Sequence, residues 1–204
     1  MKHRTLMLLG MKGGTGKSTV AIHLAVAASQ AGRHVTLLDT DPQASAMTWA
    51  SERTAPEPQV LAAPAYDAAK RIVAQDGRDL IVIDTPPRAE ADITTLAREA
   101  DLIVIPVHCT MLDLVASQVA FRMAVSAGRP FVVVFNAVNP RGLEVGEVRQ
   151  ELTAQGYTVA PSMLAARTSY ARALSSGMAV TEFERQGRAA EEITSLWKWI
   201  SKQL

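Results

Sequence analysis

Short apolar runs alternate along this chain with amphipathic stretches of helical length. The runs are nearly continuous in apolar residues, which is typical of strands that are buried on both faces of a sheet. Their alternation with helices over the whole length predicts an α/β fold, with a mainly parallel, twisted sheet and helices on both faces. The expected strands are residues 5–9, 35–38, 80–83, 102–105 and 131–135. The expected helices are residues 17–31, 66–75, 93–100, 112–127 and 145–154.

Length and composition favour one domain, residues 1–204, because undivided α/β domains often reach this size. Apolar residues make up 48% and charged residues 20%, which predicts a sizeable core and excludes a disordered chain. The net charge of +1 gives no global basicity, so any surface for nucleic acid would be a local patch. The single cysteine, Cys109, excludes an intrachain disulfide and a Cys-rich metal site.

Neither a signal peptide nor a membrane span is expected. The apolar run near the N-terminus is too short for a signal peptide, and no stretch approaches the about 20 apolar residues of a membrane span. We therefore expect a cytoplasmic protein. Residues 54–64 contain three prolines and are interpreted as a surface connection with a short edge strand at residues 60–61.

Polar or turn segments follow all five expected strands. In a parallel sheet, ligands bind beyond the carboxyl ends of the strands, so these segments should converge on one rim. They begin at Gly10, Asp39, Asp84, Pro106 and Asn136. The sequence therefore predicts a ligand site at this rim. Asn136 stands where an adenine contact could arise, and a turn-capping amide is the alternative.

The segment between the first strand and the first helix is rich in glycine and lysine. Glycines there can turn their N–H groups toward phosphate oxygens, and the helix that starts near Lys17 adds the positive end of its dipole. Lys17 can reach the β- and γ-phosphates, and the Ser18 hydroxyl can ligate Mg²⁺. The pattern predicts an ATP-binding P-loop, although Met11 stands where the strict motif has its first glycine. The expected nucleotide-binding residues are Met11, Lys12, Gly13, Gly14, Thr15, Gly16, Lys17, Ser18 and Thr19.

Lys12 is a second lysine inside this loop. It is either an ordinary solvated side chain or a cation placed against phosphate. Within one subunit it would crowd Lys17, so it could instead reach a nucleotide held by a partner subunit.

Three aspartates follow two of the expected strands. Asp84 ends an apolar strand, the position of a carboxylate that holds Mg²⁺ directly or through water, and the alternative is a turn or N-cap residue. Asp39 and Asp41 lie two residues apart, so in extended backbone both would face the γ-phosphate. One would then hold the hydrated metal and the other orient the attacking water, and the alternative is an Asx-turn before Pro42. Spacing alone does not assign the two roles.

These residues together resemble the ParA/MinD family of deviant Walker-A ATPases. The family loop K-G-G-x-G-K-[ST] matches residues 12–18, D-x-D-P-Q matches residues 39–43, and a hydrophobic strand with D-x-P-P matches residues 81–87. The segment I-P-V-x-P-[ST]-x-L-D appears at residues 105–113, where Cys109 replaces the usual proline. Residues 167–180 resemble the segment before the last helix of small ParA proteins. The short N-terminus is most similar to ParF-like partition ATPases, which lack an N-terminal helix-turn-helix domain.

The resemblance implies an ATP hydrolase that uses ATP and Mg²⁺ and forms a nucleotide-sandwich homodimer. Lys12 would cross to the partner's phosphates, Asp41 would help to activate water, and Asp39 and Asp84 would support the metal through water. The implied function is DNA partition, of plasmid or chromosome, in which the ATP form binds nonspecific DNA on the nucleoid. A small centromere-binding protein, ParB-like or of the ribbon-helix-helix type, would stimulate hydrolysis.

The sequence leaves open whether such an ATPase would bind DNA, a membrane surface or neither. Residues 191–204 form an amphipathic tail that could lie on a membrane, as in MinD-type relatives, or pack on the sheet. Two glutamates and only two lysines in this tail favour packing. A nucleotide-sensing adaptor is a third alternative. The candidate DNA-binding residues are Arg167, Arg172, Arg185, Arg188, Lys198 and Lys202.

Overall fold

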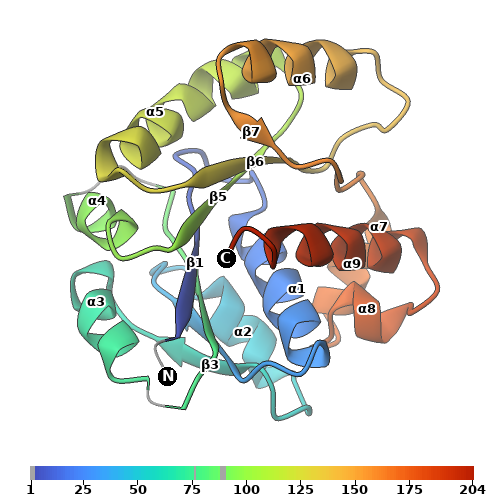
Figure 1. The fold of residues 1–204 in the computed structure, drawn as a ribbon. Coiled ribbons are helices and arrows are strands. Elements are labelled where there is room, and N and C mark those ends of the chain that lie inside the picture. The colour runs from blue at the N-terminus through green and yellow to red at the C-terminus, as the bar shows by residue number, and fades with distance from the viewer. Residues whose placement is uncertain (1–2, 76, 88–90) are drawn as a thin grey trace.

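The computed structural model describes residues 3–75, 77–87 and 91–204. A single sheet runs through the centre of the molecule, and helices cover both of its faces (Figure 1). The strands are β1 Arg4–Leu8, β2 Val35–Asp39, β3 Gln59–Ala62, β4 Leu80–Asp84, β5 Leu102–Val107, β6 Phe131–Phe135 and β7 Thr158–Val159. The helices are α1 Lys17–Gln30, α2 Ser45–Ser51, α3 Ala65–Val73, α4 Ala91–Ala97, α5 Met111–Ala127, α6 Glu144–Ala154, α7 Thr168–Leu174, α8 Val180–Phe183 and α9 Arg188–Ile200.

The sheet has seven strands in the order β3-β2-β4-β1-β5-β6-β7, and every pair of neighbours is parallel. The expected α/β fold with a parallel sheet is therefore confirmed. The register places Asp84 opposite both Leu8 and Asp39, at the carboxyl ends of β4, β1 and β2. Because all strands point the same way, their carboxyl ends form one rim, as the sequence predicted.

Side chains of each central strand alternate between two apolar clusters. Leu80 and Val82 of β4 belong to one cluster, and Ile81 and Ile83 belong to the other. Helices α1, α2 and α7 to α9 contribute to the first cluster, whereas α3 to α6 contribute to the second. Burial on both faces explains why these strands are continuous apolar runs rather than alternating ones.

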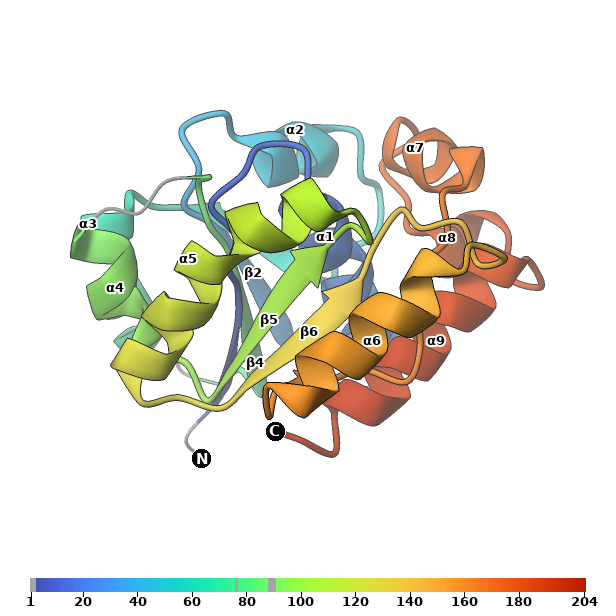
Figure 2. The ribbon, with the colours of Figure 1, turned by 90° about the horizontal axis from the view of Figure 1, so that it is seen from above.

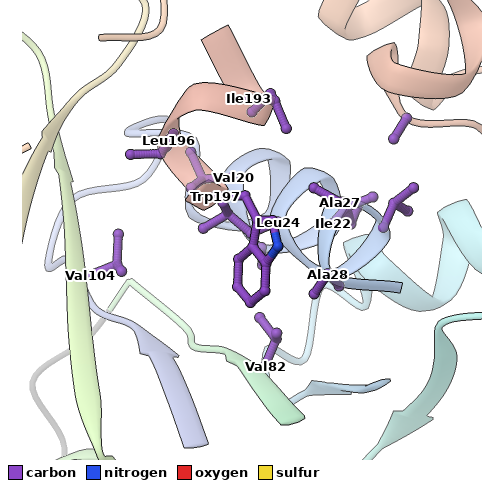
Figure 3. Packing of buried hydrophobic residues seen from close by; sticks show 14 of the residues in the cluster. Val20, Ile22, Leu24, Ala27, Ala28, Val82, Val104, Ile193, Leu196 and Trp197 are labelled. Carbon is purple, nitrogen blue, oxygen red and sulfur yellow. The ribbon is translucent and has the colours of Figure 1, made fainter. Parts of the chain in front are cut away.

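Helix α1 lies between the sheet and α9. Ten of its residues are buried, and its apolar side chains meet Val82 and Val104 on one side and Ile193, Leu196 and Trp197 on the other (Figure 3). The apolar face of α9 is therefore part of the core, since Ile193, Leu196 and Ile200 are fully buried. Of the two alternatives for the C-terminal tail, the structure shows the packed one.

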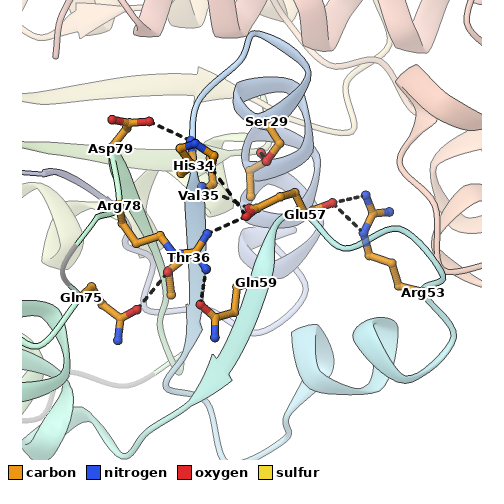
Figure 4. A network of polar contacts seen from close by, with 11 residues as sticks. Ser29, His34, Val35, Thr36, Arg53, Glu57, Gln59, Gln75, Arg78 and Asp79 are labelled. Atoms are coloured by element: carbon orange, nitrogen blue, oxygen red, sulfur yellow. Dashed lines mark hydrogen bonds and ion pairs between the residues drawn. The ribbon is translucent and has the colours of Figure 1, made fainter.

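A polar network joins the amino ends of β2, β3 and β4 (Figure 4). The Arg78 guanidinium donates to Glu57 at 2.6 Å, and Glu57 also accepts from the backbone N–H of Val35 at 3.3 Å. Asp79 accepts from the backbone N–H of His34 at 2.8 Å. These contacts satisfy backbone groups at the start of the strands.

The expected strands and helices all exist, with boundaries that shift by a few residues. The edge strand expected at residues 60–61 is β3, which stands at one end of the sheet. The sequence reading missed four short elements, namely α2, β7, α7 and α8. Within the described part of the chain, no helix is both long and apolar enough to cross a bilayer.

Candidate nucleotide site

The loop between β1 and α1 forms an open cradle at the rim of the sheet. Gly14 and Gly16 have φ angles of 82° and 85°, a left-handed conformation that favours glycine. A Cβ added at Gly13 or Gly14 would meet no atom within 4 Å, so the loop backbone borders free space. These features suit a loop whose N–H groups point at an anion at the start of α1.

A cavity of about 740 Å³ opens from this cradle and extends between α1, α2 and α7. Its volume falls in the range of small-molecule binding pockets, about 300–1,000 Å³. Six of the expected nucleotide-binding residues line it: Gly13, Gly14, Gly16, Lys17, Ser18 and Thr19. Thr15 is buried beneath the loop, and Met11 packs against an apolar cluster of the core.

Lys17 lies under the loop, with 6% of the residue exposed. Its ammonium donates to the backbone carbonyl of Lys12 at 3.4 Å. Burial lowers the pKa of Lys17, and the charges of Asp84 and Asp41 oppose this shift. A buried cation beside carboxylates would gain a strong counter-charge from a bound phosphate.

Asp84, at the carboxyl end of β4, carries a buried carboxylate that its surroundings compensate only in part. It is fully buried, and among the residues that the structure describes neither of its carboxylate oxygens has a hydrogen-bond partner. Burial raises the pKa of Asp84 to about 7, an effect that the nearby Ser18 hydroxyl and Lys17 only partly offset. A buried, unpaired carboxylate is costly, and a divalent cation would satisfy it.

The donor set near Asp84 suits Mg²⁺ better than a metal held by protein alone. Ser18 and Asp84 supply oxygen atoms, the ligand type that Mg²⁺ prefers. Among the residues that the structure describes, no cluster of three or more His, Cys, Asp or Glu side chains could hold a metal ion. Magnesium bound here would complete its shell with phosphate oxygens and water, as is usual for this ion.

Asp39, the last residue of β2, and Asp41, in the turn that follows, have different surroundings. One oxygen of Asp39 accepts from the N–H groups of Ala46 and Met47 at 2.9 and 3.0 Å, and the other accepts from Asp41 N–H at 3.1 Å. Burial raises the pKa of Asp39, and these backbone donors oppose the shift. The Asp39 carboxylate thus caps the start of α2 in this structure, and its expected role at the metal stays a prediction.

Asp41 lines the cavity together with Lys17 and Ser18. It also accepts from the backbone N–H of Gln43 at 2.9 Å, which forms the Asx-turn considered in the sequence analysis. Both readings of Asp41 are therefore compatible, since one oxygen supports the turn while the residue faces the cavity. Of Asp39 and Asp41, only Asp41 is among the described residues that line the cavity, and its expected role in activating water stays a prediction.

Lys12 does not turn toward its own cradle. Its ammonium pairs with Asp113 of α5 at 2.6 Å, and 54% of its side chain is exposed. Asp113 also accepts from the Thr110 hydroxyl at 2.6 Å, while Thr110 caps α5. The hydrogen bond from Lys12 is the main cause of the lowered pKa of Asp113, followed by that from Thr110. The sequence contained Asp113 within a matched segment but gave no sign of this pairing.

Comparisons with known proteins agree with this geometry. The sequence matches the CobQ/CobB/MinD/ParA nucleotide binding domain family over residues 6–180. The chain belongs to this family. It is 31% identical over 203 residues to the maintenance of carboxysome distribution protein A of Halothiobacillus neapolitanus, with 94% of each chain covered. It is also 27% identical over 176 residues to the protein ParA of Rhizobium radiobacter, with 81% of this chain and 79% of the relative covered.

Solved structures share the fold at lower sequence identity. A putative plasmid partition protein from Borrelia burgdorferi, bound to AMPPNP, has a TM-score of 0.79 at 16% identity, with both chains fully covered. The septum site-determining protein MinD of Pyrococcus horikoshii, complexed with Mg-ADP, has a TM-score of 0.80 at 16% identity, with 98% and 96% covered. The protein is thus a ParA/MinD-type ATPase, and the expected ATP and Mg²⁺ agree with the ligands of these neighbours.

Asn136 lies at the carboxyl end of β6, next to the P-loop of this ParA/MinD-type domain. Its side-chain amide donates to the backbone carbonyl of Thr15 at 2.7 Å, and the residue is 8% exposed. The expected adenine contact of Asn136 stays a prediction. Its contact with the loop itself was not anticipated from the sequence.

The six basic residues suggested for DNA binding lie in more than one region. Arg167 pairs with Glu192 at 2.6 Å, so its charge is already countered. Arg172 lies on α7 beside the rim and stacks over Phe183 at 5.5 Å. The last turn of α9, which carries Lys198, lies on the side of the molecule opposite α7, near the chain termini (Figure 2). The exposed members are Arg172, Arg185, Arg188, Lys198 and Lys202, and their role in DNA binding stays a prediction.

Proposed function

We propose that this protein is a positioning ATPase that partitions DNA, plasmid or chromosome, through an ATP-dependent cycle. In this cycle, Mg-ATP binding drives the formation of a homodimer that holds nonspecific nucleoid DNA. Hydrolysis, stimulated by a small centromere-binding protein of the ParB or ribbon-helix-helix type, returns the protein to its monomeric form. The observation that carries the proposal is the division of the two loop lysines: Lys17 is buried near Asp84, whereas the Lys12 ammonium reaches Asp113 on α5.

The chemistry at the rim suits phosphoryl transfer, which needs positioning and charge neutralisation more than covalent assistance from the protein. Lys17 lines the cavity and would contact the β- and γ-phosphates, and the loop backbone borders the same space. Magnesium, when bound, would neutralise phosphate charge next to Ser18 and Asp84. Asp41 faces the cavity and would orient the attacking water.

The position of Lys12 supports the proposal of a homodimer. Its side chain reaches away from its own cradle to Asp113 and is half exposed, so it is available to a second molecule. A cation that crosses between subunits would find a stronger partner in a triphosphate than in one carboxylate. We therefore propose that ATP binding in two facing subunits draws each Lys12 onto the partner's phosphates.

The kind of cargo has two candidates that the comparisons support. The relatives named ParA and chromosome-partitioning ATPase Soj favour DNA, at 27% and 28% identity. Relatives named for carboxysome distribution share 31% identity with the chain and cover more of it. The second candidate function is therefore the distribution of a carboxysome-like cargo by the same ATP-dependent cycle.

Membrane positioning and a non-hydrolysing adaptor are less well supported. The apolar face of α9, which would have to enter a lipid surface, is buried against α1 and the sheet (Figure 3). The position of Asp41 beside the phosphate cradle gives the site a residue suited to hydrolysis, which an adaptor would not need.

The test combines mass measurement with DNA binding. Light scattering after gel filtration should show a dimer with Mg-ATP and a monomer with ADP, and only the ATP form should retard nonspecific DNA at low salt. The Asp41→Ala variant should bind ATP, lose hydrolysis and remain dimeric, whereas an Asp67→Ala control on α3 should behave as the wild type. A monomer with Mg-ATP, or ATP-bound protein that pellets with anionic vesicles and ignores DNA, would contradict the proposal.

A further inference from the structure

Asn136 joins the tip of β6 to the P-loop through one buried hydrogen bond. Its side-chain amide donates to the Thr15 carbonyl at 2.7 Å across 121 residues of sequence. The contact is close on the glycine side as well, because a Cβ added at Gly16 would lie 2.2 Å from the Asn136 amide nitrogen. The absence of a side chain at Gly16 therefore permits Asn136 to sit directly against the loop.

This bond fixes the direction of a peptide group in the cradle. The peptide between Thr15 and Gly16 is planar and trans, so its carbonyl and its N–H point to opposite sides. When Asn136 holds the Thr15 carbonyl on one side, the Gly16 N–H is directed to the other. Gly16 lines the cavity, and its φ of 85° belongs to the left-handed region. An N–H held in this way is preorganised for an anion.

The position of Asn136 is itself well supported. Its backbone N–H donates to the Val107 carbonyl of β5 at 2.8 Å. The next residue, Ala137, has a φ of 50°, a conformation that costs a residue with a side chain about 1–2 kcal/mol. Val138 then donates to the Leu164 carbonyl at 3.2 Å and forms a bridge with Ala165. Contacts on both sides hold Asn136 at the end of its strand.

We infer that Asn136 is a positioning residue for the phosphate cradle, which acts by orienting the Thr15–Gly16 peptide rather than by contacting the base of the nucleotide. The inference deepens the proposed function, since it rests on a triphosphate being bound at the P-loop. It makes the affinity for the phosphate chain, with or without a nucleoside attached, depend on a residue more than one hundred positions away in the sequence.

The test compares ATP with magnesium tripolyphosphate, which has the phosphate chain but no base. Isothermal titration should give a loss of affinity of about tenfold or more for both ligands in Asn136→Ala and Asn136→Leu, the cost of a lost buried hydrogen bond. The ratio of the two dissociation constants should stay within about threefold of the wild-type ratio, because one bond to the loop serves both ligands. Asn139→Ala is the matched control, because Asn139 is exposed in the same loop and bonds only locally to Arg141.

Hydrogen exchange of the ligand-free variants provides a second readout that does not require binding. Amides of residues 13–17 should exchange faster in both Asn136 variants, while those of β1 and β5 should keep their wild-type protection. If ATP affinity falls and tripolyphosphate affinity does not, Asn136 acts on the base and the inference is wrong. If the affinities for ATP and tripolyphosphate both stay unchanged in a folded variant, the bond from Asn136 to Thr15 does not orient the cradle and the inference is wrong. Wild-type protein that binds neither ligand would instead contradict the proposed function.

Discussion

Replacing Asp84 by asparagine should stabilise the nucleotide-free protein at alkaline pH while weakening Mg-ATP binding. The Asp84 carboxylate is fully buried and has no hydrogen-bond partner within residues 3–75, 77–87 and 91–204, and burial raises its pKa from 3.8 to about 7. A folded-state pKa above the unfolded value means that the folded protein binds the proton more tightly. Stability from this group is therefore fully present below pH 4 and is lost as the pH rises through 7.

The size of the effect follows from the shift. One pKa unit corresponds to about 1.4 kcal/mol, so a shift from 3.8 to about 7 makes ionised Asp84 cost about 4 kcal/mol above pH 8. At pH 5 Asp84 is protonated in the folded protein but ionised in the unfolded chain. This difference lowers the free energy of unfolding by about 1.5–2 kcal/mol. Asparagine never ionises and removes this dependence. The stability difference between Asp84→Asn and wild type should therefore grow by about 2–3 kcal/mol between pH 5 and pH 8.

Urea unfolding at both pH values, with EDTA and without nucleotide, measures this difference. Burying the asparagine amide has its own cost, but this cost does not depend on pH. It therefore cancels when the difference in stability between variant and wild type at pH 5 is subtracted from that at pH 8. Asp67→Asn is the control and should show no such growth, because Asp67 is a partly exposed carboxylate on α3 that pairs with Arg71 at 3.1 Å. A variant-to-wild-type difference that is equal at pH 5 and pH 8 would refute the argument that Asp84 is an uncompensated charge. Titration with Mg-ATP should show weaker binding by the variant.

Three further substitutions test contacts at and around the site. Asp113→Asn should remove the charge that holds Lys12 and so promote ATP-dependent dimerisation, as measured by light scattering; an unchanged or weaker dimer would contradict the pairing. Gly177→Ala should destabilise the protein by about 2–4 kcal/mol in urea unfolding, because its Cβ would meet the Glu52 carbonyl oxygen at 2.3 Å and its φ is positive. Trp197→Ala should cost about 3–5 kcal/mol, because it empties part of the core between α9 and α1, and a variant that stays as stable as wild type would show that α9 is not core.

The sequence predicted the features that depend on burial and on local backbone chemistry. The five central strands were found because burial on both faces makes each a continuous apolar run. The P-loop was found because its glycines and Lys17 stand at fixed spacing before a helix. Short elements such as α2 and α8 were missed because four to seven residues give no helical period to detect.

Contacts between distant segments could not be read from the sequence. The pairing of Lys12 with Asp113 and the bond from Asn136 to Thr15 join residues 101 and 121 positions apart. Asp39 and Asp41 were expected to face the same way because a strand alternates sides. However, β2 ends at Asp39, and the turn that follows sends Asp41 toward the cavity while Asp39 caps α2.

The packing of α1 on two sides limits which parts of the molecule could move when a nucleotide binds. Ten of its fourteen residues are buried between the sheet and α9, so a shift of this helix would disrupt packing on two sides at once. Packing on two sides therefore holds the start of α1 in place, and in the proposed cycle we expect movement on ATP binding in the segments beside it. Those segments are the turn that carries Asp41 and the exposed start of α5, where Met111 and Leu112 are 67% and 80% accessible. In the proposed cycle, these two segments are therefore where a bound nucleotide is expected to change the surface that a second subunit would contact.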